Sequence, residues 1–78
     1  MPRYYFDHRD GNTFISDDEG LEFDGVEAAR NEATRALADA AKDALPGAVR
    51  REIVIEVRDE ASRPLLRAPL WFEVQTLA

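Results

Sequence analysis

Residues 25–45 constrain the fold of this 78-residue chain more than any other segment, because they predict one long helix. The segment contains no proline and is rich in alanine, which has the highest helix propensity. Asp24 and Glu27 have the spacing of a capping box at its start, and Pro46-Gly47 predict its end. Its apolar residues recur at spacings of three and four and therefore share one face; they are Val26, Ala29, Ala33, Ala36, Leu37, Ala40, Ala44 and Leu45. A stripe made mostly of alanine allows the helix to lie close against a sheet.

The chain before this helix predicts a β-hairpin. Residues 2–9 are rich in aromatic residues and alternate in the manner of a strand, and Asp10-Gly11 predict a tight type I′ turn. This turn pairs Phe6 with Ile15 across the hairpin. The core-facing residues are then Tyr4, Phe6, His8, Thr13 and Ile15, and the opposite face carries Tyr5, Asp7, Phe14 and Ser16. Residues 21–23 indicate a short return to extended chain before the helix.

Two further strands are predicted after the helix. Residues 51–59 alternate apolar and charged side chains, with Ile53, Ile55 and Val57 facing the core. Residues 65–74 alternate in the same way. Pro69 cannot donate a ladder hydrogen bond, so the last strand is predicted to be an edge strand or to carry a bulge.

The order strand, strand, helix, strand, strand predicts an α+β fold of the β-β-α-β-β type. A four-stranded antiparallel sheet in the order 2-1-3-4, with the helix packed on one face, satisfies every short connection. The length predicts a single domain over residues 1–78.

Most catalytic and metal chemistries lack the residues they need. The chain contains no cysteine and one histidine, which excludes disulfides and thiolate metal sites. Asp7, His8 and Asp10 could in principle form a metal or acid–base site, but neighbouring residues of a strand point to opposite faces. Asp7 and His8 therefore cannot converge, and Asp10 is expected to be used in the turn. We expect no catalytic residue, no metal site and no cofactor.

The distribution of charge argues against nucleic acid as a partner. The net charge is −6, and residues 1–24 carry seven acidic and only two basic residues. Direct nucleic-acid binding requires a continuous basic patch, which the chain lacks. Asp17, Asp18 and Glu19 predict a solvated acidic loop, because the surrounding sequence does not fit the ligand spacing of a calcium-binding EF-hand.

No apolar run is long enough to span a bilayer, and the N-terminus lacks the basic start and apolar core of a signal peptide. We therefore expect a cytoplasmic protein without a membrane partner.

A single helix covers one face of a sheet, so the other face is predicted to be open. Alternation places four apolar residues on it, and these form the candidate interaction surface: Tyr5, Phe14, Val54 and Trp71. Their neighbours are largely acidic, unlike the lysine and arginine around an RNA-stacking platform. An exposed aromatic patch with polar surroundings is typical of a contact with another protein, most simply a second copy. The alternative is that these are scattered surface residues without a partner.

Several segments carry a family resemblance: M-P-R-Y-Y-F-D, D-D-E-G, E-A-A-R-N-E-A-T-R-A-L-A-D-A-A-K-D-A-L-P, and I-E-V-R-D-E followed by R-P-L-L and F-E-V. Together they resemble a domain-of-unknown-function family of short, single-domain proteins from rhizobia and related soil bacteria. The resemblance implies an intracellular bacterial protein and carries no activity, ligand or catalytic residue. Ser62 departs from the family pattern, in which glycine is usual, and leaves the type of the last turn open.

A looser resemblance is to HicB-type antitoxins, which also run from an N-terminal sheet into an alanine-rich helix. The proline-aspartate-leucine-proline-glycine segment that usually precedes their helix is absent here. We predict a non-enzymatic protein-interaction module that self-associates, most simply as a homodimer, through the open sheet face or an edge strand. The alternative is an acidic regulatory or antitoxin-like partner of a basic protein.

Overall fold

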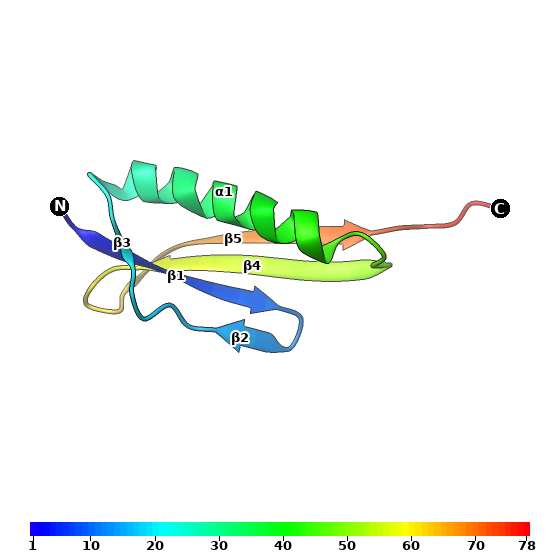
Figure 1. Cartoon of the computed structure of the whole chain (residues 1–78), viewed down its shortest axis with the longest axis horizontal. Coiled ribbons are helices and arrows are strands. Elements are labelled where there is room, and N and C mark those ends of the chain that lie inside the picture. The colour runs from blue at the N-terminus through cyan, green and yellow to red at the C-terminus, as the bar shows by residue number, and fades with distance from the viewer.

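The computed structural model describes residues 1–78 as one helix lying along one face of an antiparallel sheet (Figure 1). In chain order the elements are β1 (Arg3–Asp10), β2 (Thr13–Ile15), β3 (Leu21–Glu22), α1 (Val26–Ala44), β4 (Arg50–Arg58) and β5 (Pro64–Glu73). The α+β class and the single helix on an antiparallel sheet are confirmed. The helix lacks the combination of length and hydropathy that a bilayer crossing requires.

The predicted four-stranded sheet in the order 2-1-3-4 is wrong. The sheet has five strands, in the order β2-β1-β4-β5, and β3 pairs with β1 as well. The additional strand forms because the connection between β2 and α1 returns to the outer edge of β1, where Tyr4 pairs with Leu21. Two short strands therefore share one edge of β1, and β5 forms the opposite edge of the sheet.

The turn of the first hairpin lies one residue later than predicted. Asp10 pairs with Thr13, so the turn consists of Gly11 and Asn12, and the predicted Asp10-Gly11 turn is wrong. Gly11 has a φ of 62° and Asn12 does not have a positive φ, as in a type II′ turn. His8 consequently pairs with Ile15. This shift of two positions along β1 leaves the side chains on their predicted faces, because the faces alternate with a period of two.

The predicted capping box at the start of α1 is also wrong. The N-cap residue is Gly25, with extended backbone and no side-chain cap bond, so Asp24 lies outside the helix. Glu27 is in the first turn, where its charge favours the helix dipole without closing a box. The end of the helix agrees with the prediction, since α1 ends at Ala44 and Gly47 follows with a φ of 85°.

The core lies between α1 and the two central strands. Its six buried residues are Tyr4, Phe6, Ala29, Ala33, Ile55 and Val57. The small side chains of Ala29 and Ala33 bring the helix close to the sheet, as the alanine stripe predicts. Phe23 packs against the edge of this cluster, with its ring centroid 6.0 Å from that of Phe6 in an edge-to-face arrangement. The residues of β5 on the same face of the sheet are only half-buried, since β5 is an edge strand.

The hairpin between β4 and β5 settles two open points of the sequence. Ser62 is the only non-glycine residue with a positive φ, at 63°, which explains why glycine suits this position. The Asp59 carboxylate accepts hydrogen bonds from the N–H groups of Ala61 and Arg63 and holds the turn. Pro69 lies in the edge strand β5, and the register shift occurs at Val57 and Arg58 instead.

Candidate functional site

The structure spreads the four candidate residues unevenly over the sheet face opposite α1. One row of directly paired positions crosses four strands and consists of Phe14, Arg9, Val54 and Pro69. The next row is charged and consists of Asp7, Glu56 and Arg67. Tyr5 lies beyond that charged row, whereas Trp71 is two residues from Pro69 on the same face of β5. Phe14, Val54 and Trp71 are therefore grouped around one row, and Tyr5 is separate.

Arginine side chains cover much of the apolar surface on this face. The Arg9 guanidinium lies 4.9 Å from the ring centroid of Phe14, and that of Arg58 lies 4.6 Å from the ring centroid of Tyr5. Both distances are in the range of cation–π contacts. Val54 is only 1% exposed within the single chain. The centre of this face is thus largely occupied by the chain's own side chains.

Trp71 differs from the other three candidates. Its side chain is 71% exposed, and it is the only tryptophan in the chain. Trp71 lies on β5, the outermost strand, where it pairs with Glu52 of β4. The most exposed aromatic surface is therefore at the edge of the sheet.

The backbone of β5 is unpaired along that edge. The N–H of Val74 donates to the carbonyl of Val49 on the β4 side, at 2.8 Å. Ladder groups alternate in direction along an antiparallel strand, so the odd-numbered residues of β5 direct their backbone groups away from β4. Arg67, Trp71 and Glu73 present both a donor and an acceptor there, and Pro69 presents only its carbonyl. This edge is a template for a further strand.

The opposite edge, on β1, is closed by a side chain in addition to the two short strands. Between the positions that pair with β2 and β3, Asp17 Oδ2 accepts a hydrogen bond from the N–H of Phe6 at 3.0 Å. Asp17 Oδ1 accepts from the N–H groups of Glu19 and Gly20, at 3.0 and 3.1 Å. Gly20 has a φ of 72°, and a Cβ there would lie 2.9 Å from the carbonyl oxygen of Tyr4. The loop thus presses against β1 and takes the place of a strand.

A largely buried ion pair fixes this loop from the sheet side. Asp7 is 8% exposed and accepts from Arg58 Nε at 2.9 Å and from the N–H of Asp17 at 2.9 Å. Arg58 also donates from Nη2 to the carbonyl of Asp17 at 2.7 Å. Partial burial acts to raise the pKa of Asp17, but the N–H groups that it accepts from and the Arg58 charge outweigh this and lower the pKa below its usual value.

A second ion pair joins the end of β1, next to the first turn, to the start of β4. Arg51 donates from Nε and Nη2 to the two carboxylate oxygens of Asp10, at 2.6 and 2.9 Å. The hydrogen bond from Arg51 lowers the pKa of Asp10. Arg51 Nη1 also lies 3.4 Å from the carbonyl of Ala44 at the end of α1. Asp10 is therefore engaged with Arg51, 41 residues away, rather than in the turn.

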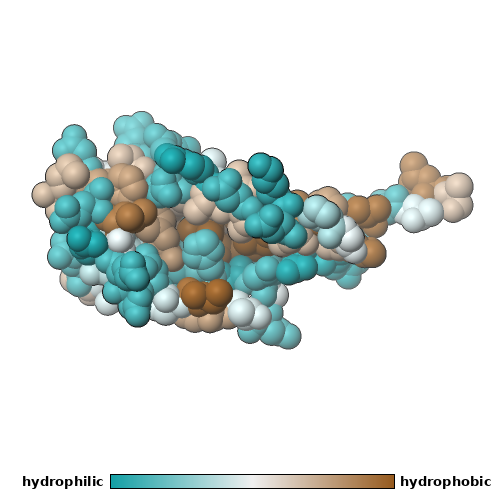
Figure 2. Space-filling model, in the orientation of Figure 1, coloured by the Kyte–Doolittle hydropathy of each residue, from teal (hydrophilic) through white to brown (hydrophobic).

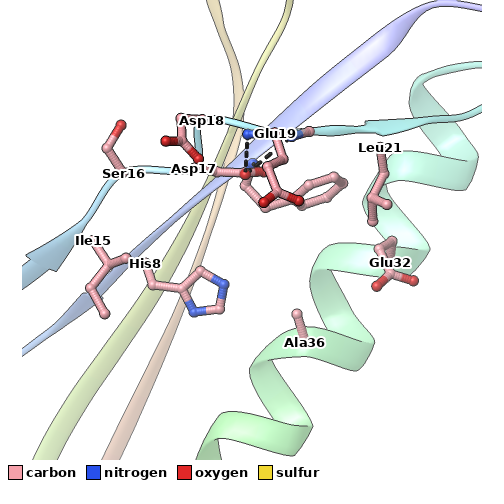
Figure 3. A pocket seen from close by; sticks show the side chains of 11 residues that line it. His8, Ile15, Ser16, Asp17, Asp18, Glu19, Leu21, Glu32 and Ala36 are labelled. Carbon is pink, nitrogen blue, oxygen red and sulfur yellow. Dashed lines mark hydrogen bonds between the residues drawn. The ribbon is translucent and has the colours of Figure 1, made fainter.

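A groove of about 420 Å³ lies between α1 and the segment from β2 to β3. Figure 3 shows the imidazole of His8 pointing from β1 toward Ala36 of the helix, with Ile15 and Leu21 at the sides. Hydrophobic atoms are visible between the helix and the strands below it, on a surface that is otherwise mostly hydrophilic (Figure 2). Asp7 is on the other side of the sheet, so the predicted separation of Asp7 and His8 is confirmed.

Sequence reasoning missed the roles of Asp17 and Arg58. It assigned Asp17 to a solvated loop together with Asp18 and Glu19. A local signal was present, since an aspartate followed three residues later by glycine is typical of a turn in which the carboxylate accepts backbone N–H groups. No local signal identifies Arg58 as the partner of Asp7, because their contact depends on the pairing of β1 with β4.

These features define a small α+β domain with one closed and one open sheet edge. The model of the family described as "Domain of unknown function (DUF6894)" matches residues 3–71, and the chain belongs to this family. No curated protein and no solved structure matches the chain.

Proposed function

We propose that this protein is a non-enzymatic protein-interaction module that self-associates along the open edge of β5. The observation that carries the proposal is a ten-residue strand whose outer edge is unpaired and bears a tryptophan that is 71% exposed. Exposed edge strands readily pair with further strands, and such pairing supplies hydrogen bonds and buries the side chains beside them. A second copy is the simplest partner, because it presents the same edge.

Sedimentation velocity over the micromolar range tests this proposal. We expect the wild-type protein to shift from monomer to dimer as its concentration rises, and Trp71→Ala to remain monomeric. The fluorescence of Trp71 provides a second signal, because its emission should shift to shorter wavelength on association. Val26→Ala is the matched control, since Val26 is 48% exposed but lies at the start of α1. A wild-type protein that stays monomeric throughout would overturn the proposal.

A second candidate function is that of an acidic regulatory or antitoxin-like partner of a basic protein. Asp18 and Glu19 line the groove, and neither of them takes part in an ion pair. Their free charges favour a basic surface that contacts this side of the domain. The candidate predicts that a basic protein co-purifies from the native host at low salt, and that Asp18→Asn with Glu19→Gln releases it. Retention of the same protein by this double variant would count against the candidate.

We further propose that the protein works in the cytoplasm of a bacterial cell, the setting that the resemblance to soil-bacterial proteins implies. Fractionation of the native host with an antibody against the protein tests this, and recovery in a membrane or secreted fraction would contradict it.

A further inference from the structure

We infer that two copies join their β5 strands antiparallel in one register, with the two-fold axis beside Leu70; this inference rests on the proposed self-association. In this register residue 69 faces residue 71 of the second copy, and residue 67 faces residue 73. Both helices then lie on the same face of one continuous sheet. The register follows from the direction of the backbone groups, the position of the proline, and the charges along the edge.

The proline argues against the register with the two-fold axis at residue 69. A two-fold axis at Pro69 would place two prolines opposite each other, in a pair where each residue should exchange both backbone hydrogen bonds. Because proline has no N–H, the centre of that interface would form none of these bonds. With the axis beside Leu70, the N–H of Trp71 donates to the carbonyl of Pro69 in the second copy, so each central pair keeps a bond. The Trp71 ring also packs beside that proline.

The charges on the open face favour the same register. Arg67 and Glu73 are the only charged residues of β5, and in this register each faces the other across the interface, twice by symmetry. Within one copy Arg67 lies 4.0 Å from Glu56, and Glu73 lies 3.1 Å from Arg50. Both residues of β5 remain well exposed in those pairs, with side-chain exposures of 59% and 45%. They are therefore accessible for additional contacts.

The apolar residues on the helix-facing side of β5 become paired as well. Leu66, Ala68, Leu70 and Phe72 are only half-buried in the single copy, although α1 packs over β4 and β5, because β5 has no neighbour on its outer side. In the inferred register Leu70 faces Leu70 of the second copy, and Ala68 faces Phe72. Pairing large with small and apolar with apolar covers the part of the core that the helix leaves partly open.

Charge reversal tests the register. Arg67→Glu and Glu73→Arg each place like charges opposite each other twice, so each variant alone should weaken the dimer by about tenfold. In a mixture of the two variants, both cross-interface pairs again join opposite charges, so the mixed dimer should form with nearly wild-type affinity. Arg50→Glu is the matched control: it disrupts the pair with Glu73 inside one copy but changes no charge at the interface.

A cysteine scan provides a second measurement that does not depend on the charged variants folding well. The chain has no cysteine, so Leu70→Cys introduces a single thiol. In the inferred register two such thiols face each other in a non-hydrogen-bonded pair, with Cα atoms about 4.5 Å apart, which a disulfide can bridge. Leu70→Cys should cross-link on mild oxidation, and Ala68→Cys should not.

The outcomes separate this inference from the proposed function. Recovery of the dimer in the mixture, together with selective cross-linking at position 70, supports the register. A wild-type dimer that neither charge reversal weakens, or that cross-links through Ala68→Cys and not through Leu70→Cys, overturns the register and leaves self-association in place. A monomeric wild-type protein overturns both.

Discussion

The two edges of the sheet differ in how their outward backbone groups are satisfied. No single strand pairs with the whole outer edge of β1. Instead β2, β3 and the Asp17 carboxylate together occupy it. The edge on β5 is longer, and no part of the chain covers it. The comparison shows that a buried charge network closes one edge of the sheet. No comparable group of side chains covers the edge on β5.

The largest expected effect comes from breaking the network that closes the β1 edge. Asp7→Ala removes the buried carboxylate that accepts hydrogen bonds from Arg58 Nε and from the N–H of Asp17. We expect the free energy of unfolding to fall by about 3 kcal/mol, as for other broken buried ion pairs. Urea denaturation followed by circular dichroism measures it. Asp18→Ala removes an exposed carboxylate next to the same loop and should change stability by less than about 0.5 kcal/mol. Equal losses in the two variants would contradict the role of Asp7.

A smaller effect is expected when only the carboxylate that replaces a strand is changed. In Asp17→Asn one carboxylate oxygen becomes an NH₂ group, which cannot accept a hydrogen bond. At least one of the N–H groups that Asp17 now accepts from therefore loses its partner. We expect a loss of about 1 to 2 kcal/mol near neutral pH.

The pH dependence of stability checks the same carboxylate. Folding lowers the pKa of Asp17 below its usual value. The stabilisation that its ionised carboxylate provides is therefore present above that usual value and is lost as the pH falls through the folded pKa. The stability of Asp17→Asn should therefore approach that of the wild type in acid. A constant difference between the two proteins from neutral pH down to acid would contradict this assignment.

The smallest effect concerns the turn that leads into the open edge. Ser62→Gly relieves a left-handed backbone conformation but adds freedom to the unfolded chain, so we expect a net gain of about 0.5 to 1 kcal/mol. Residue 61 does not have a positive φ, so Ala61→Gly should instead lower stability. Thermal unfolding of both variants measures the difference. A gain in both, or in neither, would show that the φ of Ser62 carries no cost.

Much of the fold can be predicted from periodicity. The alanine stripe locates α1 to within a residue or two, and alternation predicts β4 and β5 with the correct faces. The first turn was misplaced because Asp10-Gly11 and Gly11-Asn12 both suit a tight turn. In the observed register Asp10 forms an ion pair with Arg51, a contact far away in the sequence that no local pattern predicts.

The candidate surface was predictable only in part. Alternation places Tyr5, Phe14, Val54 and Trp71 on the face opposite the helix, and the structure agrees on that face. Alternation does not reveal that arginines cover the rings of Tyr5 and Phe14 or that Val54 is buried, because these contacts depend on side chains from other strands. The strand order decides which residue is left at an open edge, and that residue is Trp71.

Amide hydrogen exchange measured by NMR tests the difference between the two edges most directly. The N–H of Phe6, which Asp17 accepts, should be protected at every protein concentration. The N–H groups of Arg67, Trp71 and Glu73 should exchange quickly in dilute protein and become protected as the concentration rises, because a second β5 strand then pairs with them. Rapid exchange of these three amides at all concentrations would contradict the account.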